Sequence, residues 1–193
     1  MQPVTREEIL PIGEYERIRP HFRARVIEAK KLRRIHPSEI LSVVFENRDT
    51  VLLQIQEMLR TERITSEDGI LHELETYNEL LPGPGQLSAT LFVEIADAGE
   101  RERMLTALAG LDQHVALEVG GRRFPATSKE RSVEGYGRTT AVHYYKIDLD
   151  EEARAALCGG GASVAFVVDH PAHQARATLG ADTVRALADD VRS

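Results

Sequence analysis

The sequence predicts an α+β protein in which a helical N-terminal part packs on a mixed, largely antiparallel sheet formed mainly by the C-terminal part. In the first 82 residues, apolar side chains recur mostly at the three- and four-residue spacing of a helix. After the Pro-Gly-Pro-Gly turn at residues 82–85, apolar and polar residues alternate along several short stretches, which is the period of a strand. The regular alternation of strands and helices that a doubly wound sheet requires is missing.

The same turn is the best internal boundary of the chain. We expect residues 1–82 to form a mainly helical part with one strand, and residues 83–193 to form the α+β sheet part, both within one integrated domain. A chain of 193 residues is long enough to bury a core without disulfides or a structural metal.

The N-terminal part begins with a capping-box pair, Thr5 and Glu8, which predicts a short helix that stops near Pro11. A turn is expected at Gly13. Because proline suits the first turn of a helix but not its interior, a longer helix is expected over residues 20–34. Its inward side chains would be Phe22, Val26, Ile27 and Ile35, and the eight Lys and Arg residues of the stretch 17–34 predict a basic outer face.

Three further elements complete the N-terminal part. The stretch 38–45 is short, rich in Ile and Val and without a helical stripe, so it predicts a strand. Apolar residues recur at helical spacing over residues 50–65, which predicts a helix that Asn47 or Asp49 can cap. A second helix is expected over residues 66–81, where Ser66 can cap its start.

The C-terminal part predicts six strands and three helices. The Gly120-Gly121 pair between two alternating stretches predicts a tight hairpin. Residues 127–138 are polar and predict an exposed loop. The strands are expected at 86–95, 114–119, 122–126, 139–149, 162–170 and 174–178, and the helices at 98–111, 150–157 and from Asp182 onwards.

Composition and charge exclude several classes of protein. The net charge of -7 argues against general nucleic-acid binding, although residues 17–34 leave a local basic face as an alternative. Cys158 is the only cysteine, which excludes an intramolecular disulfide and a cysteine-ligated cluster. The first ten residues carry Arg6, Glu7 and Glu8 where a signal peptide would be apolar, and no apolar run approaches a membrane span. We therefore expect a cytoplasmic protein.

A dense polar segment carries a family resemblance. Residues 45–51 (FENRDTV), followed by 54–60 (QIQEMLR) and 62–64 (ERI), resemble the signature of a bacterial family catalogued as domain of unknown function 3501. Members of that family are often encoded beside a rubrerythrin-like diiron protein and an iron–sulfur oxidoreductase. The resemblance implies a role in redox or peroxide defence, with those two proteins as candidate partners.

The same segment is the first candidate site. Four polar residues at a strand-to-helix junction lie where a helix N-terminus favours anions, which points to binding of a ligand or partner. The alternative is a capped helix stabilised by ion pairs along its surface. The candidate ligand- or partner-binding residues are Glu46, Asn47, Arg48, Gln56, Glu57, Arg60 and Arg63.

Histidines on two predicted strands form the second candidate site. His143 and His170 both follow the apolar face of their strands, and Asp169 precedes His170. If the strands were neighbours, these residues could hold iron or zinc as a two-histidine, one-carboxylate site. The alternative is that each histidine is bonded to backbone, and this is favoured because no helical ExxH or HxxxH spacing supports a metal.

The sequence therefore favours an accessory or binding protein of a redox system over an enzyme. The runner-up is a metal-dependent enzyme or metal-binding protein that uses His143 and His170. Cys158-Gly159-Gly160-Gly161 does not predict a phosphate loop, because here the glycines follow a helix and precede a strand. Homo-oligomerisation is left open.

Overall fold

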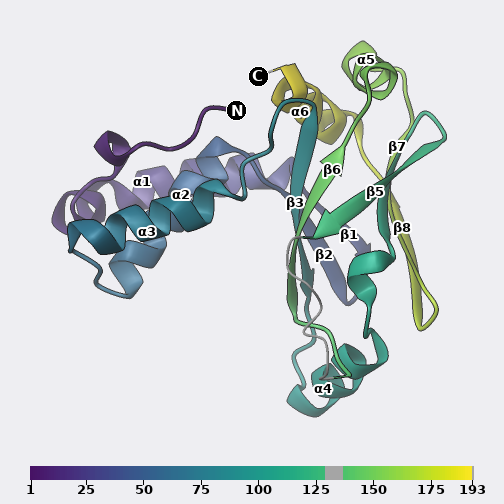
Figure 1. Ribbon diagram of the computed structural model, residues 1–193, viewed down its shortest axis with the longest axis horizontal. Helices are drawn as coiled ribbons and strands as arrows, with labels where there is room; N and C mark the ends of the chain where they lie inside the picture. Colours follow the sequence, from purple (N-terminus) through teal and green to yellow (C-terminus); the bar gives the residue numbers. More distant parts are fainter. Residues whose placement is uncertain (129–136, 193) are drawn as a thin grey trace.

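The computed structural model, which describes residues 1–128 and 137–192, confirms an α+β fold (Figure 1). Eight strands form one sheet in the order β1-β2-β3-β6-β5-β4-β7-β8, and every pairing between neighbours is antiparallel. The strands are β1 (Arg34–Ser38), β2 (Leu41–Phe45), β3 (Gln86–Val93), β4 (Val115–Val119), β5 (Arg122–Ser128), β6 (Val142–Asp148), β7 (Val164–His170) and β8 (His173–Thr178). The helices are α1 (Ile12–Lys31), α2 (Arg48–Thr61), α3 (Glu67–Asn78), α4 (Ala98–Ala107), α5 (Glu151–Gly159) and α6 (Ala181–Arg192), with short 3-10 turns η1 (Arg6–Glu8) and η2 (Leu111–Gln113).

The sheet curls until its two edge strands approach each other, so that it is nearly a closed barrel. His173 Nε2 on β8 lies 2.9 Å from Ser38 Oγ on β1. Inward side chains from every second position, such as Val43, Leu91, Ile147 and Phe166, are buried in one apolar core. In Figure 1, α5 and α6 lie at one end of the barrel and α4 at the other. Leu157 and Leu187 from α5 and α6, and Leu105 from α4, join the same core.

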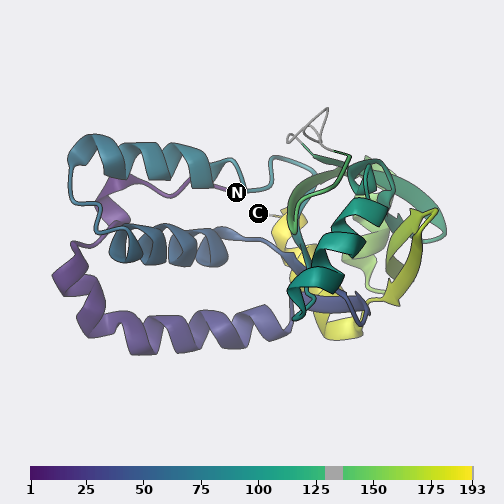
Figure 2. The same cartoon turned by 90° about the horizontal axis from the view of Figure 1, so that it is seen from below.

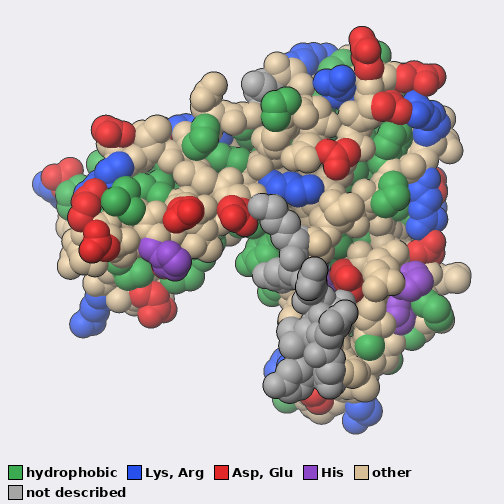
Figure 3. All heavy atoms as spheres, viewed as in Figure 1, with side chains coloured by type: hydrophobic (Ala, Val, Ile, Leu, Met, Phe, Trp, Pro, Cys, Tyr) green, Lys and Arg blue, Asp and Glu red, His purple; other side chains and the backbone are tan. Residues whose placement is uncertain are grey.

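The remaining helices form an arm beside the barrel. Figure 2 shows α2 between α1 and α3, the three running side by side. The arm has its own smaller core, in which Val51, Ile55 and Leu59 of α2 meet Ile70 and Leu74 of α3. The space-filling view shows arm and barrel meeting at an angle, with a hollow between them on one side (Figure 3). We call these parts the arm and the barrel below.

The chain passes between arm and barrel three times. The hairpin β1–β2 lies in the sheet although it follows α1 and precedes α2, and the third crossing follows α3 at residues 82–85. The N-terminal part therefore contributes two strands to the sheet, and the C-terminal part contributes α4, α5 and α6. The expected arrangement of N-terminal helices on a C-terminal sheet fits only roughly.

The prediction for the start of the arm was wrong. The expected turn at Gly13 and helix start at Pro20 are replaced by one helix of 20 residues that contains both. Pro20 is exposed, so water can reach the Glu16 carbonyl that has lost its N–H donor. Of the expected inward side chains, Val26 is buried, but Ile27 is 41 % exposed.

The end of that helix was also misplaced. The chain leaves the helix after Lys31, and Arg34–Ser38 forms β1 rather than helix. The predicted strand 38–45 is the second half of a hairpin, with Arg34 opposite Val44 and Ser38 opposite Leu41. One strand was therefore missed.

Other predicted elements are confirmed. Gly120 and Gly121 join β4 to β5 with φ of 58° and 83°, the left-handed pair that a tight hairpin turn uses. Asn47 and Ser66 accept hydrogen bonds from the third residues of α2 and α3, as expected of caps. Most of the predicted loop 127–138 lies outside the described residues. No helix within the described residues has the length and apolar character to cross a bilayer.

Candidate ligand-binding site

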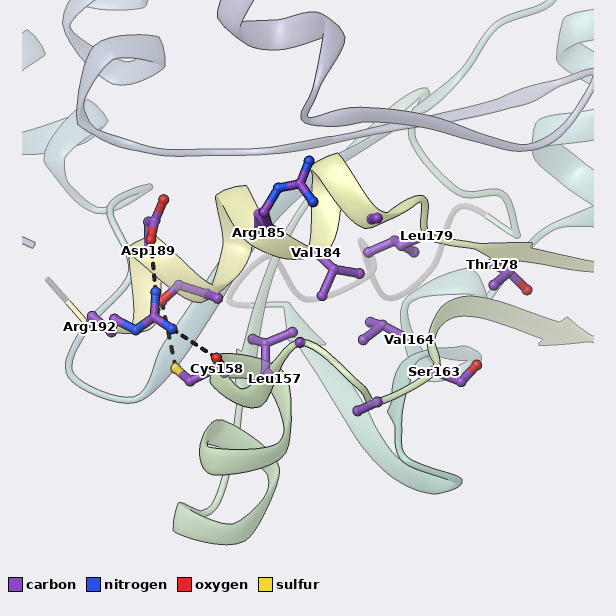
Figure 4. Close-up of a pocket in the computed structure, with 14 residues that line it drawn as sticks. Leu157, Cys158, Ser163, Val164, Thr178, Leu179, Val184, Arg185, Asp189 and Arg192 are labelled. Atoms are coloured by element: carbon purple, nitrogen blue, oxygen red, sulfur yellow. Dashed lines mark hydrogen bonds and ion pairs between the residues drawn. The ribbon is translucent and has the colours of Figure 1, made fainter.

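A cavity of about 540 Å³ opens at the barrel end that α5 and α6 cover, and we call it the α5–α6 cavity (Figure 4). Its walls come from the end of α5, the start of β7, the end of β8 and one face of α6. These segments meet because α5 and α6 pack their apolar faces, with Leu157 and Leu187, into the open end of the barrel. The volume lies within the range of about 300–1,000 Å³ typical of small-molecule sites.

The cavity has an apolar centre and polar ends. Figure 4 shows Leu157, Val164, Leu179 and Val184 pointing toward one another between α6 and the strands. Arg192 and Asp189 lie at one end, where an ion pair of 2.9 Å joins them, while Ser163 and Thr178 lie at the other. An apolar body with a polar group at each end would complement such a site.

Cys158 belongs to the polar end of the cavity. Its carbonyl accepts a hydrogen bond of 2.9 Å from Arg192, and its thiol lies 3.8 Å from the carbonyl of Ala188. The side chain is half-buried. Cys158 therefore supplies part of the wall and positions Arg192.

Glu46 from the predicted polar block is buried rather than exposed at a helix start. Only 3 % of the residue is accessible. Its Oε1 accepts a hydrogen bond of 2.6 Å from Thr90 on β3, and its Oε2 accepts bonds from Thr50 (2.5 Å) and Gln54 (3.2 Å) on α2. Glu46 thus fastens the second crossing between barrel and arm.

The next residues of the block hold the N-terminal segment in place. Asn47 caps α2 by accepting a bond of 3.0 Å from the Thr50 amide. Arg48 donates to the carbonyls of Gln2 and Pro3 and forms an ion pair with Glu8.

The α2 residues Gln56 and Glu57 bind the chain on either side of the α1 start. Gln56, 3 % exposed, exchanges two hydrogen bonds with the backbone of Leu10. Glu57 accepts two bonds from Arg19 and one of 2.6 Å from the Tyr15 hydroxyl. Arg19 is the main reason that the pKa of Glu57 falls to about 2, with a smaller contribution from Tyr15.

Arg60 near the end of α2 and Arg63 just beyond it differ in their partners. Arg60 forms an ion pair of 2.6 Å with Glu16 of α1. Arg63 is exposed, has φ of 54°, and makes no ion pair within the described part of the chain. Most of the polar block therefore has structural partners, and Arg63 is the member that faces solvent.

The basic face expected between residues 17 and 34 is largely neutralised. Acidic partners pair with five of its eight cations, namely Arg19, Arg25, Lys31, Arg33 and Arg34. Most of these charges are thus engaged within the protein itself.

The structure does not bring His143 and His170 together. His143 lies on β6 and His170 on β7, and β5 and β4 separate these strands in the sheet. His143 Nε2 lies 2.9 Å from the Thr140 carbonyl and 3.0 Å from Thr139 Oγ1, and burial lowers its pKa. His170 Nε2 donates to the Ala109 carbonyl and its Nδ1 accepts from the Ala172 amide.

Asp169 turns away from His170 toward β4 and β5. Its carboxylate pairs with Arg123, 2.5 Å away, and lies 3.5 Å from His114 Nδ1; Arg123 is the main cause that lowers its pKa. The rings of His114 and His170 meet edge to face with centroids 4.9 Å apart. Across the described residues, no three His, Cys, Asp or Glu side chains gather as a metal site.

Sequence reasoning missed the α5–α6 cavity. Its lining is mostly Leu, Val, Ala, Gly and Ser, residue types that carry no chemical signature. The only available signal was the Cys158–Gly161 segment, of which Cys158 and Gly159 end α5 and the next two glycines lead toward β7. What makes the site is the packing of α6 against that segment, which residue spacing does not encode.

Comparisons with known proteins agree with this description. A solved structure described as a novel protein of unknown function from Burkholderia pseudomallei superposes with a TM-score of 0.92 at 33% sequence identity, covering 98% of this chain and 100% of that one. Among curated proteins, none matches the chain. The family model described as "Protein of unknown function (DUF3501)" matches residues 3–191. The chain therefore belongs to the DUF3501 family.

Proposed function

We propose that the protein is a binding protein that serves a redox or peroxide-defence system, and that it holds a small molecule in the α5–α6 cavity. The observation that carries this proposal is the cavity itself, whose size and combination of an apolar centre with polar ends suit a small organic ligand. The family's implied neighbours supply the redox context and name the two candidate partners, a rubrerythrin-like diiron protein and an iron–sulfur oxidoreductase.

The separation of ligand site and arm suits an accessory role. The cavity lies at the end of the barrel, whereas the arm projects from its side (Figures 1 and 2). A ligand in the cavity would leave the exposed face of α1 and the tip of α2, with Arg63, accessible to a protein partner. In this proposal the barrel senses the small molecule and the arm presents the protein to its system.

A survival assay with matched variants tests the proposal. Ala162 lines the cavity, and Ala162→Trp would fill it. Ala155 is exposed on α5 outside the cavity, so Ala155→Trp makes the same change without blocking the site. A strain lacking the gene should lose resistance to hydrogen peroxide, and the wild type and Ala155→Trp should restore it.

In the same assay, Ala162→Trp should fail to restore resistance although it accumulates as folded protein. Restoration by Ala162→Trp equal to that by wild type would rule out the cavity. Unchanged resistance in the deleted strain would rule out the peroxide role.

A further inference from the structure

Two adjoining hollows lie at the end of the arm away from the barrel, where η1 leads into α1 and α2 leads into α3 (Figure 2). We call this end the arm tip. The first hollow, the tip slot, has a volume of about 170 Å³ and a mostly apolar lining that includes Ile9, Leu59 and Ile64. The second, the tip hollow, is wider and more open, at about 510 Å³, and is lined in part by Arg63. Ile12 lines both, so the two hollows share a wall.

The tip slot has the size and the fixed walls of a pocket for one aliphatic side chain. Ile9, Leu59 and Ile70 line it and belong to the arm's own core, with at most 8 % of each residue exposed. A cavity of about 150 Å³ already accommodates benzene, so the tip slot has room for a leucine or isoleucine side chain. Because these walls are packed in the core, the slot is formed before anything binds.

Arg63 lies where a helix end usually has glycine. The Ile64 amide donates to the Leu59 carbonyl (2.9 Å) and the Arg63 amide to the Arg60 carbonyl (3.4 Å), which is the backbone pattern that closes a helix around a left-handed residue. Arg63 is that residue, with φ of 54°, and it is the one non-glycine residue with positive φ in the described part of the chain. Glycine adopts this conformation freely, whereas a Cβ atom disfavours it. Glycine would therefore suit the fold better than the arginine that is present.

The charge of Arg63 is also left over at the tip. Among the three charged residues that line the tip hollow, Arg60 and Glu16 form an ion pair of 2.6 Å with each other. Arg63 is exposed and makes no ion pair with any residue that the structure describes. In the tip slot the one charged lining residue, Arg6, pairs with Glu67. The arm tip therefore presents an apolar slot next to one uncompensated cation.

We propose that the arm tip docks an acidic segment of a partner protein, with one aliphatic side chain in the tip slot and the carboxylate of a neighbouring Asp or Glu on Arg63. The proposal rests on the function proposed above in one respect, that the arm is the part that meets a protein partner. Arg63 and Ile64 are adjacent in the chain, so neighbouring residues of a bound segment can reach both. The buried side chain would supply affinity, and the guanidinium–carboxylate bond would set the register of the segment.

An NMR titration of the ¹⁵N-labelled full chain with three capped peptides tests this. Acetyl-Glu-Glu-Leu-Glu-Glu-amide carries the anchor and the charge; a second peptide has Ala in place of Leu, and a third has Gln in place of every Glu. The first should shift the amide signals of residues 9–12 and 59–65 saturably, and the other two should bind about tenfold more weakly. Because the protein carries a net charge of -7, overall attraction cannot draw an acidic peptide to it.

Equal binding of the three peptides, or no saturable shift at the arm tip, would overturn the proposal. Shifts of the same signals that depend on protein concentration without peptide would assign the tip to a second copy of the chain and would equally contradict it.

Arg63→Gly separates docking from folding. It should weaken binding of the first peptide about tenfold, yet leave the thermal unfolding temperature unchanged or higher, because φ of 54° suits glycine. The control Arg23→Gln removes the same charge from an exposed position on α1 outside both hollows and should leave binding unchanged. An Arg63→Gly protein that keeps full binding, or that is markedly less stable, would contradict the proposal.

The arm tip shares no residue with the α5–α6 cavity, so the two proposals fail separately. Arg63→Gly should leave the cavity intact, and Ala162→Trp should still bind the first peptide as wild type does. Loss of peptide binding in Ala162→Trp would place the peptide in the cavity and overturn docking at the arm tip.

Discussion

Arg33 and Asp190, 157 residues apart in the chain, form a bidentate ion pair in the interior of the protein. The two hydrogen bonds measure 2.5 and 2.9 Å, and the side chains are 9 % and 6 % exposed. Arg33 lies at the first crossing from arm to barrel, and Asp190 lies on α6. The pair therefore links the segment between α1 and β1 to α6, the helix that forms one wall of the α5–α6 cavity.

Loss of either partner should strongly destabilise the protein. Arg33→Met alone, or Asp190→Leu alone, is expected to lower the free energy of unfolding by about 3–5 kcal/mol, because each removes one member of a buried ion pair and keeps the other charge buried. The double variant should recover most of that loss, since it buries no charge. Urea unfolding of all four proteins measures this, and single variants that cost less than about 1 kcal/mol would show that the pair is not buried in solution.

Glu57 should make the arm sensitive to acid. Its carboxyl has a pKa of about 2 in the folded protein against an ordinary value of 4.5, so the folded state favours the ionised form. The resulting stability is fully present above about pH 4.5 and is lost as the pH falls toward 2. Allowing for its partial exposure, the contribution is about 2 kcal/mol.

Glu57→Gln is expected to remove this contribution at pH 7 and to flatten the dependence of stability on pH below 4.5. Glu67→Gln is the matched control, because Glu67 forms an exposed ion pair with Arg6 and should contribute less than about 1 kcal/mol. Denaturant unfolding between pH 3 and 7 measures both. Parallel pH profiles for wild type and Glu57→Gln would show that Arg19 does not hold the carboxylate.

Glu46 and Arg48 at the second crossing lie two residues apart, yet they should contribute differently to the stability of the protein. Glu46→Ala leaves the buried Thr90 hydroxyl without its acceptor and removes one of the two acceptors of Thr50, and should cost about 2–3 kcal/mol of stability. Arg48→Ala breaks a half-exposed ion pair and should cost less than about 1 kcal/mol. Thermal denaturation distinguishes them, and an equal effect of both changes would contradict the burial of Glu46.

Metal analysis tests the histidine arrangement. Both ring nitrogens of His170 are engaged with backbone, and His143 has its own partners on a strand that β5 and β4 separate from that of His170. Protein purified without a histidine tag from a medium rich in iron and zinc should therefore contain far less than one metal ion per chain. Stoichiometric iron or zinc that is lost in His143→Ala or His170→Ala would show that the two histidines do converge.

Sequence patterns predicted those elements whose signals are local. The β4–β5 hairpin depends on two glycines that can adopt positive φ, and the start of α2 depends on the cap at Asn47, so both were found. Strand β1 was missed because Arg34 and His36 face solvent and Pro37 interrupts its pattern; only pairing with β2 makes it a strand.

The same distinction applies to the candidate sites. The sequence drew attention to the polar block, but most of its acidic and basic residues are engaged with segments distant in sequence, such as Glu57 with Arg19 and Glu46 with Thr90. The α5–α6 cavity arises where non-consecutive elements meet, and it leaves no pattern along the chain.

Native mass spectrometry tests the central claim most directly. Protein purified from the organism that encodes it, during growth with peroxide, should carry a small-molecule adduct. Ala155→Trp should retain the adduct and Ala162→Trp should lose it, because Ala162 lines the α5–α6 cavity and Ala155 does not. A wild-type protein without any adduct, or an adduct that Ala162→Trp keeps, would contradict the account.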